Sequence, residues 1–173
     1  NLAIGYQMNG GFAEYIRLDE TVVKYGPIAV LPAHTSFEEG CLAEPLACCI
    51  NGMEVTGMKK GKSVLVIGAG PVGCMLAMLA KALGASKTIL ADISSERLNA
   101  SKVADANHYF NSIDSAAFEE SVLNATNGEG VDVVFTACPS PEAQEASTRL
   151  LRNKGTVNFF GGLPQGSKKI SLD

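Results

Sequence analysis

The sequence predicts an α/β protein whose core is a doubly wound parallel sheet with helices on both faces. Apolar strands alternate with helical stretches from residue 63 to residue 160. The first of these strands runs into a glycine turn that opens a helix, and the next strand ends in an acid. Regular alternation of this kind builds a parallel sheet that is covered on both sides.

Composition narrows the class of protein. The 173 residues are 46% apolar and 18% charged, which suits a folded chain with a sizeable core. The net charge of −4 gives no electrostatic footprint for nucleic acid or for an anionic membrane surface. We see no apolar run of membrane-spanning length and no signal segment, so we expect a small-molecule partner rather than a nucleic acid or a membrane.

The cysteines indicate a reducing compartment. Their number is five, and they include no C-x-x-C pair, so neither a disulfide framework nor a zinc-finger spacing is indicated. We therefore expect a cytoplasmic protein. The chain also begins with Asn1 rather than Met, so we interpret it as a piece of something longer.

Two segments near the start do not belong to the regular alternation. Residues 10–18 alternate apolar and polar side chains after a glycine pair, which predicts a half-buried strand. Residues 28–31 predict a second short strand that ends at Pro32. We interpret both as β remnants of a separate domain.

A helical region follows. Ser36 is a candidate cap for a helix that starts at Phe37 with two acids in its first turn. A long apolar helix then runs through Met53, with a break or kink expected near Pro45.

The central motif is a strand over residues 63–67 that runs into three spaced glycines. Gly68 allows a tight turn, Gly70 lets a pyrophosphate approach the backbone, and Gly73 lets the helix pack against the sheet. The helix that begins at Pro71 and Val72 offers free N–H groups to phosphates.

The next strand, residues 87–92, supplies the matching acid. Asp92 ends this strand and is positioned to accept hydrogen bonds from ribose hydroxyls. An acid there repels a 2′-phosphate, which favours NAD over NADP. Ile93 follows directly, and Arg97 either supports a phosphate, stacks on adenine, or is a solvated charge on a helix face.

The remaining elements continue the alternation. Ser94 or Ser95 caps the next helix, and Pro141 sits at a tolerated first-turn position of a later one. The predicted segments are a strand at 108–110, a helix at 115–124, a strand at 131–135, a helix at 141–151 and a strand at 156–160.

In such a sheet the ligand lies beyond the carboxyl ends of the strands, near the switch point between the first and fourth. This topology predicts that Thr136, Cys138 and the backbone around Phe160, Gly161 and Gly162 line the nicotinamide half of the cleft. Cys138 is not expected to be a nucleophile, because no paired histidine is evident from the spacing.

The ordered motifs resemble one family. Gly-Gly-Phe-Ala-Glu-Tyr, then Glu44-Pro45-Leu46-Ala47, then the glycine turn and Asp92 are similar to the zinc-dependent medium-chain dehydrogenases. The resemblance is strongest to their polyol branch, typified by sorbitol, xylitol and butanediol dehydrogenases. It implies a GroES-like catalytic domain, of which residues 1–35 are a remnant, and an NAD-binding domain of the Rossmann type over residues 36–173.

The resemblance also implies an activity, which is NAD-linked oxidation of a secondary alcohol by a zinc enzyme that is a dimer or tetramer. Glu44 matches the position from which this part of the family reaches the zinc, directly or through its water. The family's other zinc ligands have no match here, and neither His34 nor His108 lies in a ligand motif. We therefore expect a coenzyme-binding portion that is inactive alone.

Two alternatives remain open at the level of sequence. One is a zinc-free quinone or enoyl reductase of the same superfamily, against which Glu44 argues. The other is a non-enzymatic dinucleotide-binding module. Zinc content and alcohol-dependent NADH formation would separate all three.

Overall fold

The computed structural model describes residues 4–26 and 28–171. The chain forms two compact units, with the boundary along the sequence between Gly40 and Cys41. The first unit contains two short helices, α1 (Glu20–Tyr25) and α2 (Phe37–Gly40). The helix α2 begins where the sequence predicts. Ser36 Oγ accepts from the Glu39 N–H at 3.1 Å, and a Glu39 carboxylate oxygen accepts from the Ser36 N–H at 2.9 Å.

The two strands predicted in this first unit are wrong. Residues 10–18 and 28–31 contain no strand among the described residues, and side chains such as Phe12 and Val30 are exposed. A strand forms only when another strand completes its hydrogen bonds, and no described segment pairs with either stretch. An alternating pattern alone is therefore not sufficient.

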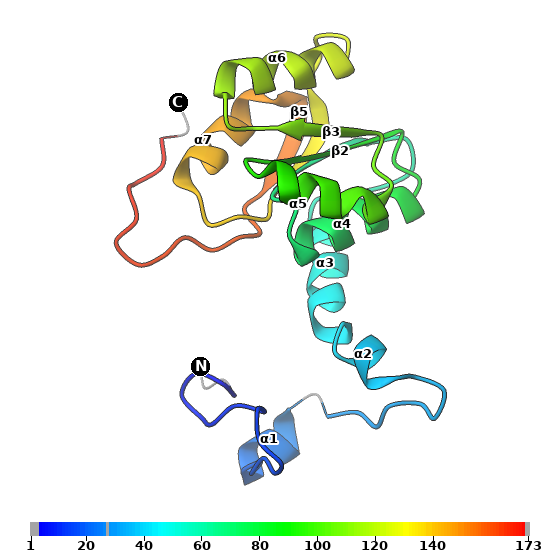
Figure 1. Ribbon diagram of the computed structural model, residues 1–173, viewed down its shortest axis with the longest axis vertical. Helices are drawn as coiled ribbons and strands as arrows, with labels where there is room; N and C mark the ends of the chain where they lie inside the picture. Colours follow the sequence, from blue (N-terminus) through cyan, green and yellow to red (C-terminus); the bar gives the residue numbers. More distant parts are fainter. Residues whose placement is uncertain (1–3, 27, 172–173) are drawn as a thin grey trace. The chain divides into compact units, whose positions relative to one another are not determined.

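The second unit is the predicted parallel sheet (Figure 1). Its five strands lie in the order β3-β2-β1-β4-β5, and every neighbouring pair is parallel. The strands are β1 (Ser63–Ile67), β2 (Lys87–Asp92), β3 (His108–Asn111), β4 (Val131–Thr136) and β5 (Leu151–Asn158).

Helices cover both faces of this sheet, as expected of a doubly wound fold. Leu76 and Phe135 belong to a core cluster on one face, and Phe118 and Leu150 belong to a cluster on the other. The helices are α3 (Ala43–Val55), α4 (Pro71–Ala82), α5 (Ser95–Ala100), the 3₁₀ turn η1 (Ser101–Ala104), α6 (Ser115–Ala125) and α7 (Pro141–Arg149).

Three elements differ most from the sequence prediction. The apolar helix is interrupted at residues 41–42 rather than near Pro45, which lies in the first turn of α3, where a missing N–H costs nothing. The helix α7 ends at Arg149. The strand β5 begins at Leu151 and ends at Asn158, because Leu151 pairs with Val131 ahead of a register shift.

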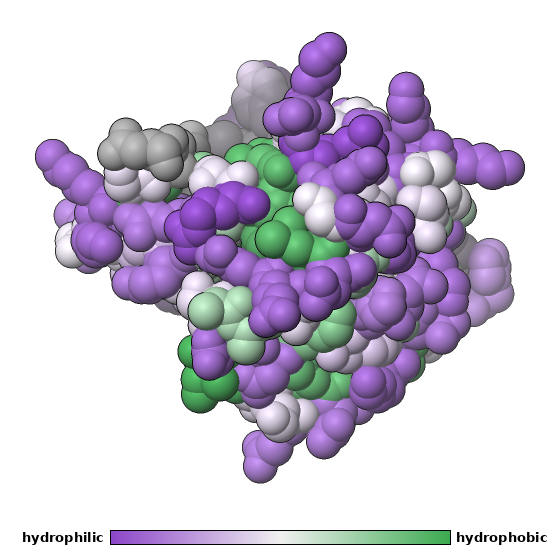
Figure 2. Space-filling model, turned by 90° about the horizontal axis from the view of Figure 1, so that it is seen from above, coloured by the Kyte–Doolittle hydropathy of each residue, from purple (hydrophilic) through white to green (hydrophobic). Residues whose placement is uncertain are grey.

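The surface is polar over most of the face seen in Figure 2, where hydrophilic residues surround a few hydrophobic ones. None of the helices in the described part of the chain has the length and apolar character needed to cross a bilayer.

Candidate functional site

The loop from β1 to α4 needs glycine at two positions. Gly68 has φ +114°, which side chains rarely adopt, and a Cβ there would lie 2.8 Å from the Ala137 carbonyl oxygen. A Cβ on Gly73 would lie only 1.8 Å from the Gly68 carbonyl oxygen. Gly70 is different, because a Cβ there would meet nothing within 4 Å. The fold itself requires Gly68 and Gly73, whereas Gly70 leaves the space beside the loop open.

Asp92 fastens this loop to the end of β2. Its side chain is buried, with one oxygen accepting from the Ala69 N–H at 2.8 Å and the other from the Ser94 N–H at 2.8 Å. Arg97 on α5 lies 3.9 Å from the same carboxylate and is largely exposed. Each carboxylate oxygen keeps a further lone pair, so Asp92 can still accept from a ligand hydroxyl.

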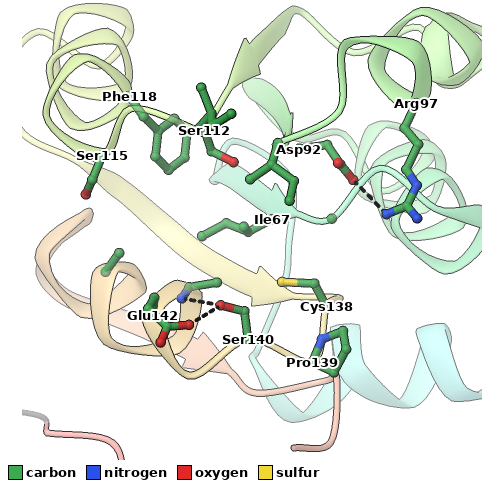
Figure 3. Close-up of a pocket in the computed structure, with 15 residues that line it drawn as sticks. Ile67, Asp92, Arg97, Ser112, Ser115, Phe118, Cys138, Pro139, Ser140 and Glu142 are labelled. Carbon is green, nitrogen blue, oxygen red and sulfur yellow. Dashed lines mark hydrogen bonds and ion pairs between the residues drawn. The ribbon is translucent and has the colours of Figure 1, made fainter.

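A pocket of about 450 Å³ opens beside Asp92, and we call it the Asp92 pocket (Figure 3). Its walls come from the loops after β1, β2, β3 and β4 and from the starts of α6 and α7. Apolar side chains including Ile67 and Phe118 line it, together with a few polar groups. This is the carboxyl edge of a parallel sheet at its switch point, where such folds bind ligands.

A second pocket, of about 490 Å³, lies between α3 and the end of β5, and we call it the Glu44 pocket. Glu44, Cys48 and Phe160 are among its lining residues. The Cys48 thiol donates to a Glu44 carboxylate oxygen at 3.3 Å, one helical turn away. This hydrogen bond, followed by desolvation and the Glu44 charge, raises the pKa of the Cys48 thiol, so the sulfur stays protonated.

The structure divides the predicted site residues between the two pockets. Gly68, Ile93, Arg97 and Cys138 line the Asp92 pocket together with Asp92. The sequence predicts that Cys138 lines the nicotinamide half of the cleft, and in the structure Cys138 lines the same pocket as Asp92. Burial, reinforced by the Asp92 charge and opposed by the Ser140 N–H, raises the pKa of the Cys138 thiol. A raised pKa lowers the fraction of this thiol that is ionised near neutral pH.

Residues at the end of β5 take different positions. Phe160 lines the Glu44 pocket. Gly161 donates its N–H to the Thr136 carbonyl oxygen at 2.6 Å, and a Cβ on it would lie 2.6 Å from the Cys138 carbonyl oxygen. A Cβ on Gly162 would meet nothing within 4 Å. The Thr136 side chain is fully buried and lines neither pocket.

Sequence reasoning missed several side chains of the site. Ser112, Ser140 and Glu142 line the Asp92 pocket. Gln144, which is buried, donates its side-chain N–H to the Gly161 carbonyl oxygen at 3.0 Å. The cap-and-proline signal of Ser140 and Pro141 marks a helix start at the ligand edge, and it was the available clue to Glu142.

The residues present do not fit a catalytic zinc ion. Such a site needs about three protein ligands, and Glu44 and Cys48 make only two. Across the described residues, no group of three His, Cys, Asp or Glu side chains is close enough to hold a metal ion. The Glu44 pocket therefore offers at most part of a metal site.

Comparison with known proteins identifies similar chains. The zinc-binding dehydrogenase family matches residues 71–173. Sorbitol dehydrogenase of Bacillus subtilis strain 168 is 32% identical over 154 residues, which are 89% of this chain and 42% of that protein. The chain thus spans less than half the length of this relative.

The solved structures that resemble this chain are also dehydrogenases. A structure described as a zinc-binding dehydrogenase from Sinorhizobium meliloti 1021 bound to NADP is 31% identical, with a TM-score of 0.83 over 99% of this chain and 48% of that one. Galactitol-1-phosphate dehydrogenase from Escherichia coli is 28% identical, with a TM-score of 0.81 over 98% of this chain and 46% of that one.

Proposed function

The chain belongs to the zinc-binding dehydrogenase family, and we propose that it is the coenzyme-binding part of an enzyme that oxidises a secondary alcohol or polyol with NAD. Relatives named for sorbitol and galactitol 1-phosphate support a polyol substrate and argue against a zinc-free quinone or enoyl reductase. The bound coenzyme would supply the hydride acceptor at its nicotinamide ring.

The observation that carries this proposal is the position of Asp92. Its carboxylate holds the Ala69 N–H of the glycine loop at 2.8 Å and lines a pocket at the switch point of the sheet. A dinucleotide whose pyrophosphate lies at the start of α4 would bring its ribose to this acid. The loop, the helix start and the acid are therefore arranged as one coenzyme site, with Gly68, Gly70, Pro71, Val72 and Gly73 around the phosphates.

NAD is the coenzyme that the Asp92 charge favours, because a 2′-phosphate would lie against a buried carboxylate. NADP is the second candidate. Arg97 lies 3.9 Å from Asp92 with an exposed guanidinium, and the similar Sinorhizobium meliloti structure has NADP bound. Comparing the affinities of NADH and NADPH for this chain decides between them, and tighter NADPH binding would overturn the preference for NAD.

Glu44 is the one residue of this chain that we propose as part of a zinc site. In a longer enzyme that contains this sequence, Glu44 would face the metal from the Glu44 pocket while ligands from elsewhere complete the site. The Glu44→Ala variant of that enzyme should lose most of its turnover while NADH still binds. Unchanged turnover would dispose of a metal-side role for Glu44, and this chain alone should show no alcohol-dependent NADH formation.

Three further features are proposed from the family resemblance. Residues 1–35 would be part of a GroES-like catalytic domain, and the protein would be cytoplasmic and homo-oligomeric. One observation supports the cytoplasmic location, and another supports the homo-oligomeric state. Cys48, Cys49, Cys74 and Cys138 form no disulfide, and β5 is an edge strand of the sheet, with hydrogen-bonding groups that a second strand could use. Light scattering of the purified chain tests the oligomeric state.

The experiment that tests the coenzyme proposal is a fluorescence titration of this chain with NADH. Saturable 1:1 binding is expected, and Asp92→Ala should weaken it. Absence of binding by a chain that unfolds cooperatively on heating would overturn the proposal.

A further inference from the structure

The Asp92 pocket carries a second carboxylate that the proposed function does not use. Glu142, in the first turn of α7, lines this pocket together with Ser140. In Figure 3, Glu142 and Ser140 lie on the opposite side of the pocket from Asp92 and Arg97. The pocket is therefore acidic at both sides, although a coenzyme ribose needs only one of the two acids.

The wall between the two acids suits a flat apolar ring. Ile67 and Phe118 are almost fully buried and present their side chains to the pocket, and Ala143 and Ala146 of α7 complete this surface. A purine base that extends from a ribose at Asp92 would lie on these side chains. Its edge would then approach the residues at the start of α7, where Glu142 is found.

Glu142 is held as an acceptor. Ser140 Oγ donates to its carboxylate at 2.9 Å and accepts from the Ala143 N–H at 3.2 Å, so the hydroxyl hydrogen is directed at Glu142. The N–H of Glu142 itself and then the Ser140 hydroxyl lower the pKa of this carboxyl, with Lys168 contributing less. An ionised carboxylate has about four lone-pair sites and no hydrogen to donate. It can therefore accept another donor and cannot pair with a carbonyl oxygen.

Adenine and hypoxanthine differ in the hydrogen-bonding group at position 6 of the purine ring. Adenine carries an amino group at position 6, which donates, whereas hypoxanthine carries a carbonyl oxygen there, which accepts. We propose that Glu142 is a specificity-determining residue of the coenzyme site, whose carboxylate accepts a hydrogen bond from the 6-amino group of the purine base. This inference rests on the proposed binding of a dinucleotide in the Asp92 pocket.

The test compares NADH with reduced nicotinamide hypoxanthine dinucleotide, which keeps the same phosphates, riboses and nicotinamide. Fluorescence titration of the whole chain gives the ratio of the two dissociation constants. The native chain should prefer NADH by about three- to tenfold, a modest ratio because Glu142 is exposed to water.

The matched variant is Glu142→Gln, which keeps the shape of the side chain and its bond to Ser140. Its amide can donate to the 6-carbonyl of hypoxanthine, so the preference for NADH should shrink to unity or reverse. Because the ratio is the measured quantity, any general change in affinity from removing a negative charge cancels. Glu120→Gln is the control, since Glu120 is an exposed acid of α6 that does not line the pocket, and its ratio should equal the native one.

The outcomes separate this inference from the proposed function. Equal affinities for both dinucleotides in the native chain, or a native ratio that survives in Glu142→Gln, would overturn the role of Glu142 and leave coenzyme binding intact. Failure of both dinucleotides to bind would overturn the coenzyme site and the role of Glu142 with it.

Discussion

The two pockets of the second unit are similar in volume, about 450 and 490 Å³, but they differ in how completely their side chains are arranged. In the Asp92 pocket the acid has two backbone partners, and the neighbouring glycine loop is fixed by close backbone contacts. In the Glu44 pocket, the one hydrogen bond that the Glu44 carboxylate accepts from a side chain within the described residues comes from the Cys48 thiol. The Asp92 pocket has the residues to bind a ligand within this chain, whereas the Glu44 pocket needs further ligand residues from elsewhere to hold a metal ion.

The most damaging single change should be Gly73→Ala. Its methyl group would overlap the Gly68 carbonyl, so α4 would have to move away from the end of β1. We expect a loss of more than about 3 kcal/mol in the free energy of unfolding, measured by urea denaturation. A variant of native stability would show that the close backbone contact between Gly68 and Gly73 does not fix the glycine loop.

Asp92→Asn should affect both stability and binding. One amide nitrogen would face a backbone N–H in place of an acceptor, which costs about 1–3 kcal/mol. NADH affinity should also fall by about tenfold or more, and the preference for NADH over NADPH should shrink because the repelling charge is gone. Titration with both coenzymes checks this, and an unchanged preference would remove Asp92 as the residue that discriminates between them.

Gly70→Ala should separate binding from folding. A Cβ there has open space, so the melting temperature should stay near the native value. The methyl group would occupy the space through which a pyrophosphate approaches the loop, so NADH affinity should fall by about tenfold. Native affinity in this variant would mean that the phosphates lie elsewhere.

A pH-dependent effect is expected at the other end of the sheet, away from the ligand edge. Partial burial acts to raise the pKa of Asp132, but hydrogen bonds from the Ser63 N–H and hydroxyl, both at 2.8 Å, and the charge of Arg152 outweigh it and lower this pKa. The stabilisation is therefore present above the pKa of about 3.9 of an unfolded Asp, and it is lost as pH falls through the lower folded value.

The Asp132→Asn variant should accordingly lose about 1 kcal/mol in the free energy of unfolding at pH 7, and its stability should fall less than that of the native chain as the pH drops below the pKa of about 3.9 of an unfolded Asp. Urea denaturation at several pH values measures this. NADH affinity should not change, because Asp132 lines neither pocket. The same acid sensitivity in native and variant chains would assign the effect to other carboxylates.

The smallest effect should come from Thr136→Val. Within the part of the chain that the structure describes, Thr136 Oγ1 is the buried side-chain polar atom that lacks a hydrogen-bond partner. Replacing the hydroxyl by a methyl of similar size should leave stability unchanged or raise it by up to about 1 kcal/mol. A clear loss of NADH affinity at native stability would show that the hydroxyl contacts the coenzyme after all.

The sequence predicted the second unit well because its signals are local. Val64 to Ile67 form an apolar run, glycines stand where the backbone comes closest, and Ser94 and Ser140 cap the helices that follow the strands. These features depend on neighbours along the chain. The switch point expected between the first and fourth strands agrees with the observed pairing of β1 with β4.

The errors arose where structure depends on distant partners. Residues 10–18 carry an alternating pattern but pair with no described strand, and β5 begins at Leu151 because Val131 lies opposite it. The same cause hid part of the site. Whether Ser140 and Glu142 face the Asp92 pocket depends on how α7 and its preceding loop pack on the sheet, which the sequence pattern does not encode.

The difference between the two pockets is tested most directly by calorimetric titration of this chain with NADH, in the absence and in the presence of Zn²⁺. NADH should bind 1:1 in both cases, and Zn²⁺ at micromolar concentration should bind neither stoichiometrically nor in a way that changes NADH affinity. Tight 1:1 binding of Zn²⁺ that disappears in Glu44→Ala, or a folded chain that fails to bind NADH, would contradict the account.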